Sequence, residues 1–282
     1  MKSTNTIARI ALTLLCLAAF ASASFAATKP LSEPFGLALD SKGDLYVANF
    51  GGGEVLVYNP AYNQIASKTI SNSLTSPTGV ALDINGNVYV SDFSSSAVNQ
   101  YSPAGKLEQQ LTSANGISDP VAVAIDGVGD LFVNNGFLNV SLYAPLLGNQ
   151  LEQSQSAGAL GVTTVYGIAT RGGVWALGTD QGFKQTPLDI FFIDGGTNPP
   201  VAGTTGSAVA FDGSGNIYSA NLDGTLDFYS PPTQALVQFK DLGYAARGMV
   251  VDAVRGRIYI SNFDGNQIQV YNTGGVLLKT IE

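Results

Sequence analysis

The chain has 282 residues, of which 12% are charged, and its formal net charge is −8. It contains no histidine, which excludes Ser-His-Asp and Cys-His catalysis, histidine-ligated zinc and imidazole general bases. The acidic excess argues against nucleic acid and anionic membrane surfaces as partners, because both attract basic residues. Any catalysis would depend on carboxylates, tyrosine, lysine or a metal ion held by oxygen ligands.

The first 26 residues follow the order of a secretory signal peptide. Lys2 and Arg9 supply positive charge, residues 10–20 form an apolar run, and residues 24–26 place small side chains around a cleavage site. We therefore predict a signal peptide over residues 1–26 and a mature chain over residues 27–282. Without Lys2 and Arg9 the mature chain has 11 basic residues against 21 acidic ones, a net charge of about −10.

The single cysteine, Cys16, lies inside the apolar run. Leu14 and Leu15 precede it, where a lipoprotein signal would carry a small residue, so no lipid anchor is predicted. The mature chain has no cysteine for a disulfide, and no later stretch approaches the roughly 20 apolar residues that a membrane span needs. We expect a secreted or periplasmic protein without a membrane span in the mature chain.

One sequence pattern recurs six times after the signal, at intervals of about 43 residues. The fullest copies cover residues 34–50 and 77–93, and weaker copies cover residues 120–135, 165–178, 206–221 and 246–262. The closing polar position of the pattern falls at residues 49, 92, 135, 178, 221 and 262, and five of these six are Asn or Asp. A repeat of this length cannot bury its own apolar face and must stack on its neighbours.

The first repeat predicts four antiparallel strands. Residues 36–40 and 45–48 are short apolar runs. The turn between them contains Asp40 and Gly43, a combination typical of β-hairpin turns. Residues 54–58 alternate as a third strand, and residues 64–70 are the predicted fourth, outer strand. Four such strands form one blade of a propeller.

The third strand recurs in the later repeats. It is predicted over residues 98–101, 140–143, 226–229 and 268–271, with residues 188–193 as the candidate in the divergent fourth repeat. Pro60 follows the third strand of the first repeat, and Pro103, Pro145 and Pro231 follow three of the later ones. Proline stops a strand from extending because it lacks a backbone donor. The last repeat carries its own fourth strand at residues 276–281, so we expect no strand exchange and closure of the ring by side-chain packing.

Small residues occupy one face of the innermost strand in five of the six repeats. They are Gly36/Ala38, Gly79/Ala81, Ala122/Ala124, Gly167/Ala169 and Ala208/Ala210. We predict that they lie in the core and let adjacent sheets approach closely near the axis. The fold class is therefore all-β, a six-bladed β-propeller of four-stranded blades. The expected blades are near residues 34–75, 77–117, 120–163, 165–204, 206–243 and 246–282.

The pattern Pro-x-Gly-Leu-Ala-Leu-Asp-x-x-Gly-Asp-Leu-Tyr-Val-Ala-Asn, followed by Val-Leu-Val-Tyr-Asn-Pro, resembles the NHL repeat. It is also similar to the six-bladed propellers of the SMP-30 and gluconolactonase type. The resemblance covers nearly the whole mature chain and implies the fold. It leaves function open, because this architecture carries binding scaffolds, lactonases and lyases.

The lactonase resemblance implies a divalent cation in the central channel, held by a Glu before the first inner strand and by Asn and Asp at the middle of later Pro-x-Gly segments. Glu33 occupies the first of these places. The middle positions are Phe35, Thr78, Val121, Tyr166, Ser207 and Arg247, and none is a carboxylate or an amide. A hard cation needs six or more oxygen ligands, so the family's metal site is predicted to be absent. The related lyases are expected to use histidine, which this chain lacks.

The candidate binding site is the end of the channel where the loops before the first strand and after the second strand meet. The residues predicted there are Glu33, Phe35, Asn49, Asp92, Asn135, Tyr166, Asn221, Arg247 and Asn262. Amides and aromatic rings around a concave mouth suit a sugar, a peptide or another polar molecule. The alternative is that each Asn or Asp caps a loop. This capping role is favoured over ligand binding, because the Asn or Asp recurs at the same position of each repeat. Glu33, Tyr166 and Arg247 break the repeat and are the stronger candidates, and Gly178 is predicted to leave a gap in the ring.

The opposite end carries Asp-x-x-Gly turns at Asp40, Asp83, Asp126, Asp212 and Asp252, with Arg255 in place of the last glycine. These carboxylates could attract a cation, but we expect them to cap their turns. Residues 146–164 are longer and more polar than a connection requires, and we expect a surface loop there.

These observations favour an exported, non-catalytic NHL-type propeller that acts as a scaffold for a peptide, glycan or protein, with no cofactor. The alternative is a lactonase or hydrolase that uses calcium or another divalent cation, which requires Glu33 to converge with Asp92 and the Asn ring. A third possibility is a structural protein of the cell envelope without a small ligand.

Overall fold

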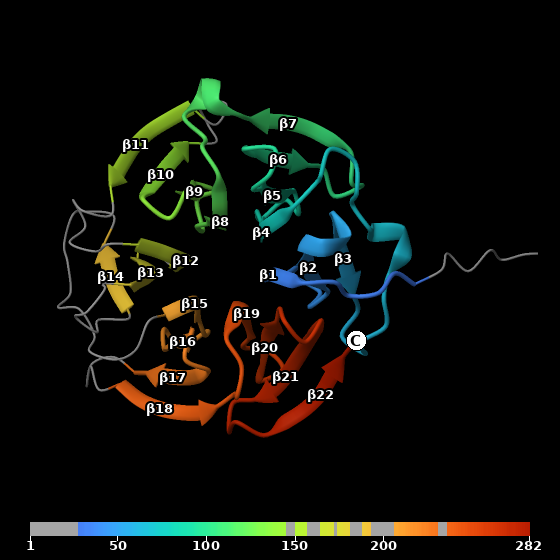
Figure 1. Cartoon of the computed structure of the whole chain (residues 1–282), viewed down its shortest axis with the longest axis vertical. Coiled ribbons are helices and arrows are strands. Elements are labelled where there is room, and N and C mark those ends of the chain that lie inside the picture. The colour runs from blue at the N-terminus through green and yellow to red at the C-terminus, as the bar shows by residue number, and fades with distance from the viewer. Residues whose placement is uncertain are drawn as a thin grey trace, which may run out of the picture.

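Each repeat begins with a two-stranded hairpin, and the hairpins are arranged around one axis (Figure 1). The computed structural model describes residues 28–144, 150–156, 164–171, 174–180, 188–192, 206–230 and 236–282. The predicted signal peptide lies outside these residues. Within them the strands form six antiparallel sheets, four with four strands and two with three, and the chain order within each sheet is consecutive. The prediction of an all-β propeller is confirmed.

The strand bounds follow the repeats. The first sheet contains β1 (Pro34–Leu39), β2 (Leu45–Asn49) and β3 (Glu54–Tyr58). The second contains β4 (Pro77–Leu82), β5 (Val88–Asp92), β6 (Ala97–Tyr101) and β7 (Leu107–Leu111). The third contains β8 (Pro120–Ile125), β9 (Leu131–Asn135), β10 (Asn139–Ala144) and β11 (Gln150–Ser156).

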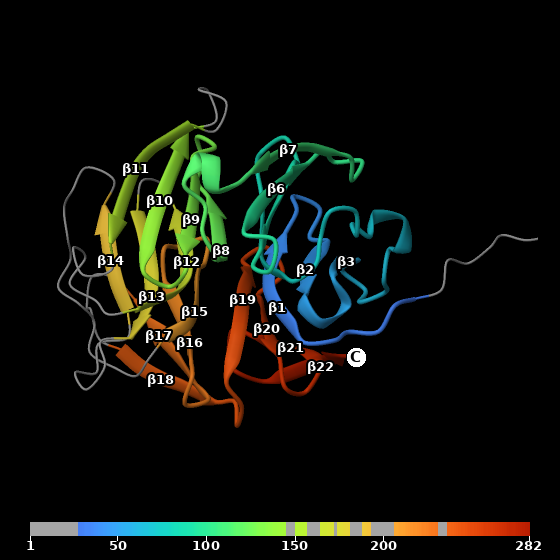
Figure 2. The same ribbon diagram turned by 45° about the horizontal axis from the view of Figure 1, so that its top comes forward.

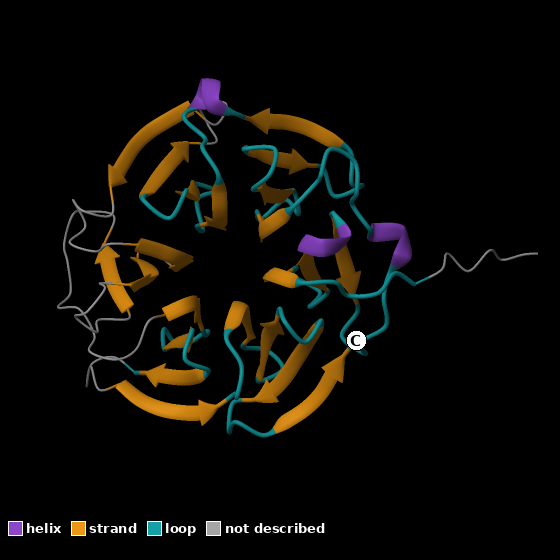
Figure 3. Ribbon diagram, in the orientation of Figure 1, coloured by secondary structure: helices purple, strands orange, loops and turns teal. Residues whose placement is uncertain are grey.

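The fourth sheet contains β12 (Thr164–Arg171), β13 (Val174–Asp180) and β14 (Leu188–Phe192). The fifth contains β15 (Gly206–Phe211), β16 (Ile217–Asn221), β17 (Thr225–Tyr229) and β18 (Leu236–Asp241), and the sixth contains β19 (Ala246–Asp252), β20 (Arg257–Asn262), β21 (Gln267–Asn272) and β22 (Leu277–Ile281). Short 3-10 helices at Phe50–Gly52, Ala66–Lys68 and Ser113–Asn115 interrupt the loops (Figure 3). No helix among the described residues is long and apolar enough to cross a membrane.

Aspartates cap the hairpins between first and second strands, as predicted. In the turn after β4, Asp83 Oδ1 accepts hydrogen bonds from the backbone N–H of Asn85 and of Asn87, each at 2.9 Å. Gly86 supplies the positive φ of 81° that the turn needs. The same carboxylate-to-backbone bonds occur at Asp40, Asp126, Asp212 and Asp252. The aspartates therefore shape the turns locally.

The hydrophobic core is divided into layers between neighbouring sheets. One layer packs Val55 and Val57 of the first sheet against Val88 and Val90 of the second. Corresponding clusters fill the remaining contacts around the ring. Because both faces of each sheet are covered, β2, β5, β9 and β16 are buried along their whole length, and β20 is buried at all but its two end residues.

Glycines on the innermost strands bring the backbones of neighbouring sheets together. A β-carbon at Gly79 would lie 2.8 Å from the backbone nitrogen of Val123, and one at Gly167 would lie 2.8 Å from the carbonyl oxygen of Ser207. No real β-carbon tolerates such distances without a shift of the backbone. The predicted close approach of the inner strands is confirmed.

The ring closes between the first and last sheets, where β1 and β19 lie side by side (Figure 2). Leu31 and Leu37 pack with Ile268 and Ile281 in one buried cluster. Arg257 Nη1 donates to the carbonyl oxygen of Pro60 at 3.0 Å. Among the described strands none crosses from one sheet to the other, so the closure depends on side-chain packing and a few hydrogen bonds, as predicted.

Three expectations about the outer strands and the repeat frame are corrected. Residues 64–70 do not form a fourth strand: they carry a 3-10 helix between isolated bridges, Tyr58 to Gln64 and Val55 to Ile70. The expected loop at residues 146–164 contains β11, paired with β10. In the fourth repeat the residue that pairs next to the bulge is Thr179, opposite Val165, whereas Gly178 pairs with Gly167. The predicted closing position was therefore displaced by one residue.

Gly178 has a packing role in place of the predicted gap. A β-carbon there would lie 2.7 Å from the carbonyl oxygen of Gly206. The residue lets the fourth and fifth sheets approach, in the way that the inner-strand glycines do. The fourth outer strand expected before residue 204 lies outside the described residues.

Candidate binding site at the channel mouth

An irregularity in the pairing of first and second strands positions the candidate site. The register shifts near the start of all six inner strands, for example between Pro77 and Gly79 and between Val165 and Gly167. A bulge of this kind releases one residue from the ladder and redirects its side chain. The released positions include the six middle positions of the repeat, which line one end of the channel: Phe35, Thr78, Val121, Tyr166, Ser207 and Arg247.

The cavity at this end, which we call the mouth, is small. Its volume is about 60 Å³, whereas sites that enclose a small molecule usually measure about 300–1,000 Å³. Below the mouth lies a belt of six apolar residues, each 4–8% exposed: Leu37, Val80, Val123, Ile168, Val209 and Met249. A ligand at the mouth must therefore lie on the surface, because the belt narrows the channel beneath it.

Hydroxyl groups join neighbouring sheets around the mouth. Thr78 Oγ1 donates to the carbonyl oxygen of Pro120 at 3.0 Å, and Ser207 Oγ donates to the carbonyl oxygen of Ala246 at 2.6 Å. Both side chains are buried. Thr78 and Ser207 therefore hold the inner strands together, and of the six middle positions Phe35, Tyr166 and Arg247 are the ones with partly exposed polar or aromatic side chains.

Aromatic rings gather on one side of the mouth, where the first and last sheets meet. The ring of Phe35 lies 6.4 Å from that of Phe50 and 6.0 Å from that of Phe263, measured between centroids. Phe50 and Phe263 are 5.9 Å apart. The guanidinium carbon of Arg247 lies 5.8 Å from the ring centroid of Phe263, within the range of a cation–π contact. We call these four residues the aromatic platform.

A second aromatic pair lies on the other side. Phe137 and Tyr166 make an edge contact with centroids 5.5 Å apart. Phe137 has a positive φ of 63° in the loop after β9, a backbone conformation that is unusual for a bulky residue. The sequence interpretation did not include Phe137. The residue two positions after the closing Asn or Asp is Gly51, Ser94, Asp223 or Asp264 in other repeats, so a large aromatic residue at that place was the available signal.

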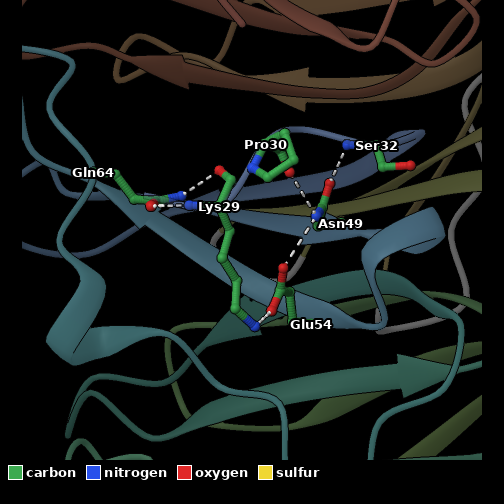
Figure 4. A network of polar contacts seen from close by, with 6 residues as sticks. All are labelled: Lys29, Pro30, Ser32, Asn49, Glu54 and Gln64. Atoms are coloured by element: carbon green, nitrogen blue, oxygen red, sulfur yellow. Dashed lines mark hydrogen bonds and ion pairs between the residues drawn. The ribbon is translucent and has the colours of Figure 1, made fainter. Parts of the chain in front are cut away.

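The predicted amide ring is buried and its polar atoms are engaged. Asn49 is 0% exposed, and its Oδ1 accepts a hydrogen bond from the backbone N–H of Ser32 at 2.7 Å. Its Nδ2 donates to the carbonyl oxygen of Pro30 and to Glu54 Oε1. Figure 4 shows how Asn49 and Glu54 hold the segment before β1, with Lys29 paired to Glu54. Asn49 therefore anchors the backbone.

The other members of the ring have comparable roles. The carboxylate of Asp92, which is 0% exposed, accepts hydrogen bonds from the backbone N–H of Thr75 at 2.6 Å and of Ser76 at 3.0 Å. Asn135 accepts from Ser118 N–H at 3.2 Å, and Asn262 accepts from Gly265 N–H at 2.9 Å. These bonds match the capping alternative.

Asn221, like Asn49, meets a buried acid. Its Nδ2 donates to Asp227 Oδ2 at 2.6 Å and to Thr225 Oγ1 at 2.8 Å. Burial raises the pKa of the Asp227 carboxyl, the hydrogen bond from Asn221 lowers it, and the negative charge of Asp223 raises it. The pair lies within the fifth sheet, away from the residues that line the mouth.

Glu33 does not line the mouth. Its backbone has a positive φ of 51°, and its N–H donates to Asn266 Oδ1 at 2.7 Å. A β-carbon at Gly51 would lie 2.9 Å from Glu33 Oε2, which places the carboxylate beside the loop after β2. Across the described residues no group of three or more His, Cys, Asp or Glu side chains is placed to hold a metal ion.

Comparisons with known proteins agree on the fold. The profile of a family described as a beta-propeller repeat (SBBP) matches residues 64–91. A streptogramin B lyase structure is similar with a TM-score of 0.65 and 9% identity, over 91% of this chain and 85% of that chain. A hydrazine synthase from Kuenenia stuttgartiensis is similar with a TM-score of 0.63 and 13% identity, over 92% of this chain and 89% of that chain.

A structure of a nidogen/laminin complex gives a TM-score of 0.69 and 15% identity, over 85% of this chain and 93% of that chain. No curated protein matches the sequence. At these identities the likeness shows the propeller fold, which carries both enzymes and binding proteins.

Proposed function

We propose that this protein is an exported, non-catalytic propeller of the NHL type, with each of its six sheets acting as one blade. Its mouth face binds a peptide segment of a partner protein. The observation that carries the proposal is the aromatic platform, in which Phe35, Phe50 and Phe263 lie beside the guanidinium of Arg247. Aromatic residues and arginine are the residue types enriched in the energetically important centres of protein interfaces.

The shape of the mouth supports surface binding over the enclosure of a substrate. A cavity of about 60 Å³ accommodates little more than one or two water molecules. A rigid, slightly concave face with aromatic rings on two sides suits an extended chain that lies across it. The structure of a nidogen/laminin complex, which is an assembly of proteins, has a similar fold.

A glycan is the second ligand class for the same face, since aromatic rings also stack on sugars. The lactonase alternative requires a cation between Glu33 and Asp92. A cation there would compete with the hydrogen bonds that Asp92 accepts from Thr75 and Ser76. We therefore rank cation-dependent hydrolysis below binding.

The test uses residues 27–282 on immobilised peptide and glycan libraries, comparing the native chain with Arg247→Ala and Phe263→Ala. We expect the native chain to bind peptides and each variant to bind the same peptides with an affinity about tenfold lower or more. Leu278→Ala, at a leucine of the outer strand β22 that is 49% exposed, is the control and should bind like the native chain. Glycan binding with the same dependence would reassign the ligand class.

The enzyme alternative has its own measurement. The thermal unfolding midpoint is followed with calcium, magnesium, manganese or zinc and then with chelator. A rise of several degrees that Glu33→Gln abolishes would favour a cation-dependent enzyme. Binding to neither library, together with no cation effect, would contradict the proposed function.

A further inference from the structure

The opposite end of the channel carries a larger cavity, which we call the funnel. Its volume is about 350 Å³, and it is lined by the second halves of the six inner strands. Its outermost residues are Leu39, Leu82, Ile125, Thr170, Phe211 and Val251. The apolar belt is its floor, because the belt residues line both cavities.

The side chains that line the funnel are apolar except that of Thr170, and Thr170 Oγ1 already donates to the carbonyl oxygen of Ile125 at 2.8 Å. The polar atoms exposed in the funnel therefore belong mainly to the backbone of the inner strands. A bulky side chain that enters the funnel meets apolar side chains from every inner strand and backbone groups between them. The volume is large enough for one bulky apolar side chain and lies at the lower limit for small-molecule sites.

Exposed apolar residues surround the funnel at the tips of its hairpins. Ile84 is 91% exposed, Val128 is 78% exposed and Val254 is 90% exposed. They lie in the turns that follow β4, β8 and β19, the strands that line the funnel. Each of three hairpins thus carries one exposed aliphatic side chain beside the funnel, and we call these three residues the patch.

The charge of the rim selects the partner. Asp40, Asp83, Asp126, Asp212 and Asp252 each follow the last funnel residue of their strand. Lys68 pairs with Asp40, and Arg255 pairs with Asp252. Asp83, Asp126 and Asp212 form no ion pair within the described part of the chain, and their carboxylates accept from N–H groups of their own turns. Arg171 takes the sixth such position and donates to the carbonyl oxygen of Gly213. The rim keeps an excess of aspartates over basic residues, so a chain with lysine or arginine beside its apolar residue matches it.

We propose that the funnel and its hairpin tips form a second docking surface for a protein segment in which a bulky apolar side chain is flanked by basic residues. The apolar side chain fills the funnel, Ile84, Val128 and Val254 contact the flanking backbone, and the unpaired aspartates face the basic groups. This surface is independent of the mouth, since the belt separates the two ends.

The probe is a fluorescently labelled peptide, Lys-Lys-Gly-Trp-Gly-Lys-Lys, measured by fluorescence anisotropy against the native chain. Two matched peptides replace the central Trp by Ala or the four Lys by Glu. The protein variants are the triple substitution Ile84→Ser, Val128→Ser, Val254→Ser and the pair Asp83→Asn, Asp212→Asn. Leu138→Ser, 59% exposed at the mouth end, is the control.

We expect the Lys-Trp peptide to bind and both matched peptides to bind at least about tenfold more weakly. The triple variant should lose binding, and the Asn pair should weaken it and reduce its salt dependence. All substituted side chains are exposed or can still cap their turns, so the unfolding midpoint should not change. Leu138→Ser should bind like the native chain.

Several results would overturn the proposal. These are no binding of the Lys-Trp peptide, equal binding of the Glu-flanked peptide, or an equal loss in Leu138→Ser. Self-association in sedimentation velocity that the triple variant abolishes would assign the patch to a second copy of the chain. Binding of the neutral dye N-phenyl-1-naphthylamine that the peptide does not displace would assign the funnel to a small apolar ligand.

Discussion

Gly248 of the last sheet lies against the backbone carbonyl of Phe35 in the first sheet. A β-carbon at residue 248 would stand 2.1 Å from that oxygen, so the two inner strands can meet only because this residue has no side chain. The contact is part of the closure of the ring, and it also fixes the spacing of Phe35 and Arg247 at the mouth.

Gly248→Ala should therefore destabilise the protein by about 1–3 kcal/mol or more, because the inner strands must move apart. Chemical unfolding monitored by circular dichroism gives the free energy of unfolding. Gly127→Ala is the matched control, since a β-carbon there meets nothing within 4 Å. It should change stability by less than about 0.5 kcal/mol, and equal effects of the two substitutions would refute the packing role.

Asp92→Ala should cost about 1–3 kcal/mol of unfolding free energy, because it leaves the backbone N–H groups of Thr75 and Ser76 without their acceptor. Asp92→Asn should retain most of the stability, since four other repeats carry Asn at this position. Thermal unfolding of the two variants distinguishes anchoring of the loop from a role of the carboxylate charge. A larger loss of stability in the Asn variant than in the Ala variant would favour a role of the carboxylate charge.

Leu31→Ala should destabilise the closure by about 2–5 kcal/mol, the usual cost of truncating a buried leucine. Leu31 is 5% exposed and packs in the cluster between the first and last sheets. Leu278→Ala, at a leucine that is 49% exposed in the same closure region, should be nearly neutral. Denaturant midpoints of the two variants test whether the segment before β1 contributes to the closed ring.

Asp227→Asn should stabilise the protein at neutral pH. Burial raises the pKa of Asp227 in the folded state, so the folded protein holds this proton more tightly than the unfolded chain does. The contribution to stability is greatest below the unfolded pKa and is lost as pH rises through the folded pKa. The advantage of the Asn variant should therefore shrink on acidification towards pH 4, and an advantage that is constant with pH would argue against the buried charge.

Alkaline pH should unfold the protein as its tyrosines ionise. Burial raises the pKa of Tyr58 to about 12, above the ordinary value near 10. The unfolded chain releases its tyrosine protons first, so the stability linked to Tyr58 is present below about pH 10 and is lost as pH rises towards 12. Tyrosinate absorbance should rise together with the loss of circular dichroism, whereas ionisation before unfolding would show that Tyr58 is accessible.

The sequence by itself determined the propeller, the hairpin turns and the six places where a bulged residue meets the channel. It could do so because these features depend on local chemistry: Asp83 caps a turn four residues long, and Gly79 has the size that the neighbouring strand requires. The third strand of the divergent repeat, Leu188–Phe192, was also predicted. The local pattern failed at Gly178, because the interval of 43 residues pointed there whereas the fourth repeat pairs Val165 with Thr179, one residue later.

Only the tertiary structure decided which candidate residues line the mouth. Asn49, Asp92 and Asn135 have the composition of a binding ring, but their burial and their bonds to distant backbone groups depend on how each loop folds back on its sheet. The aromatic platform unites Phe50 with Phe263, more than 200 residues apart. The funnel likewise forms from six strands at once, and no single repeat contains it. Such sites depend on the closure of the ring, which brings the two ends of the sequence together.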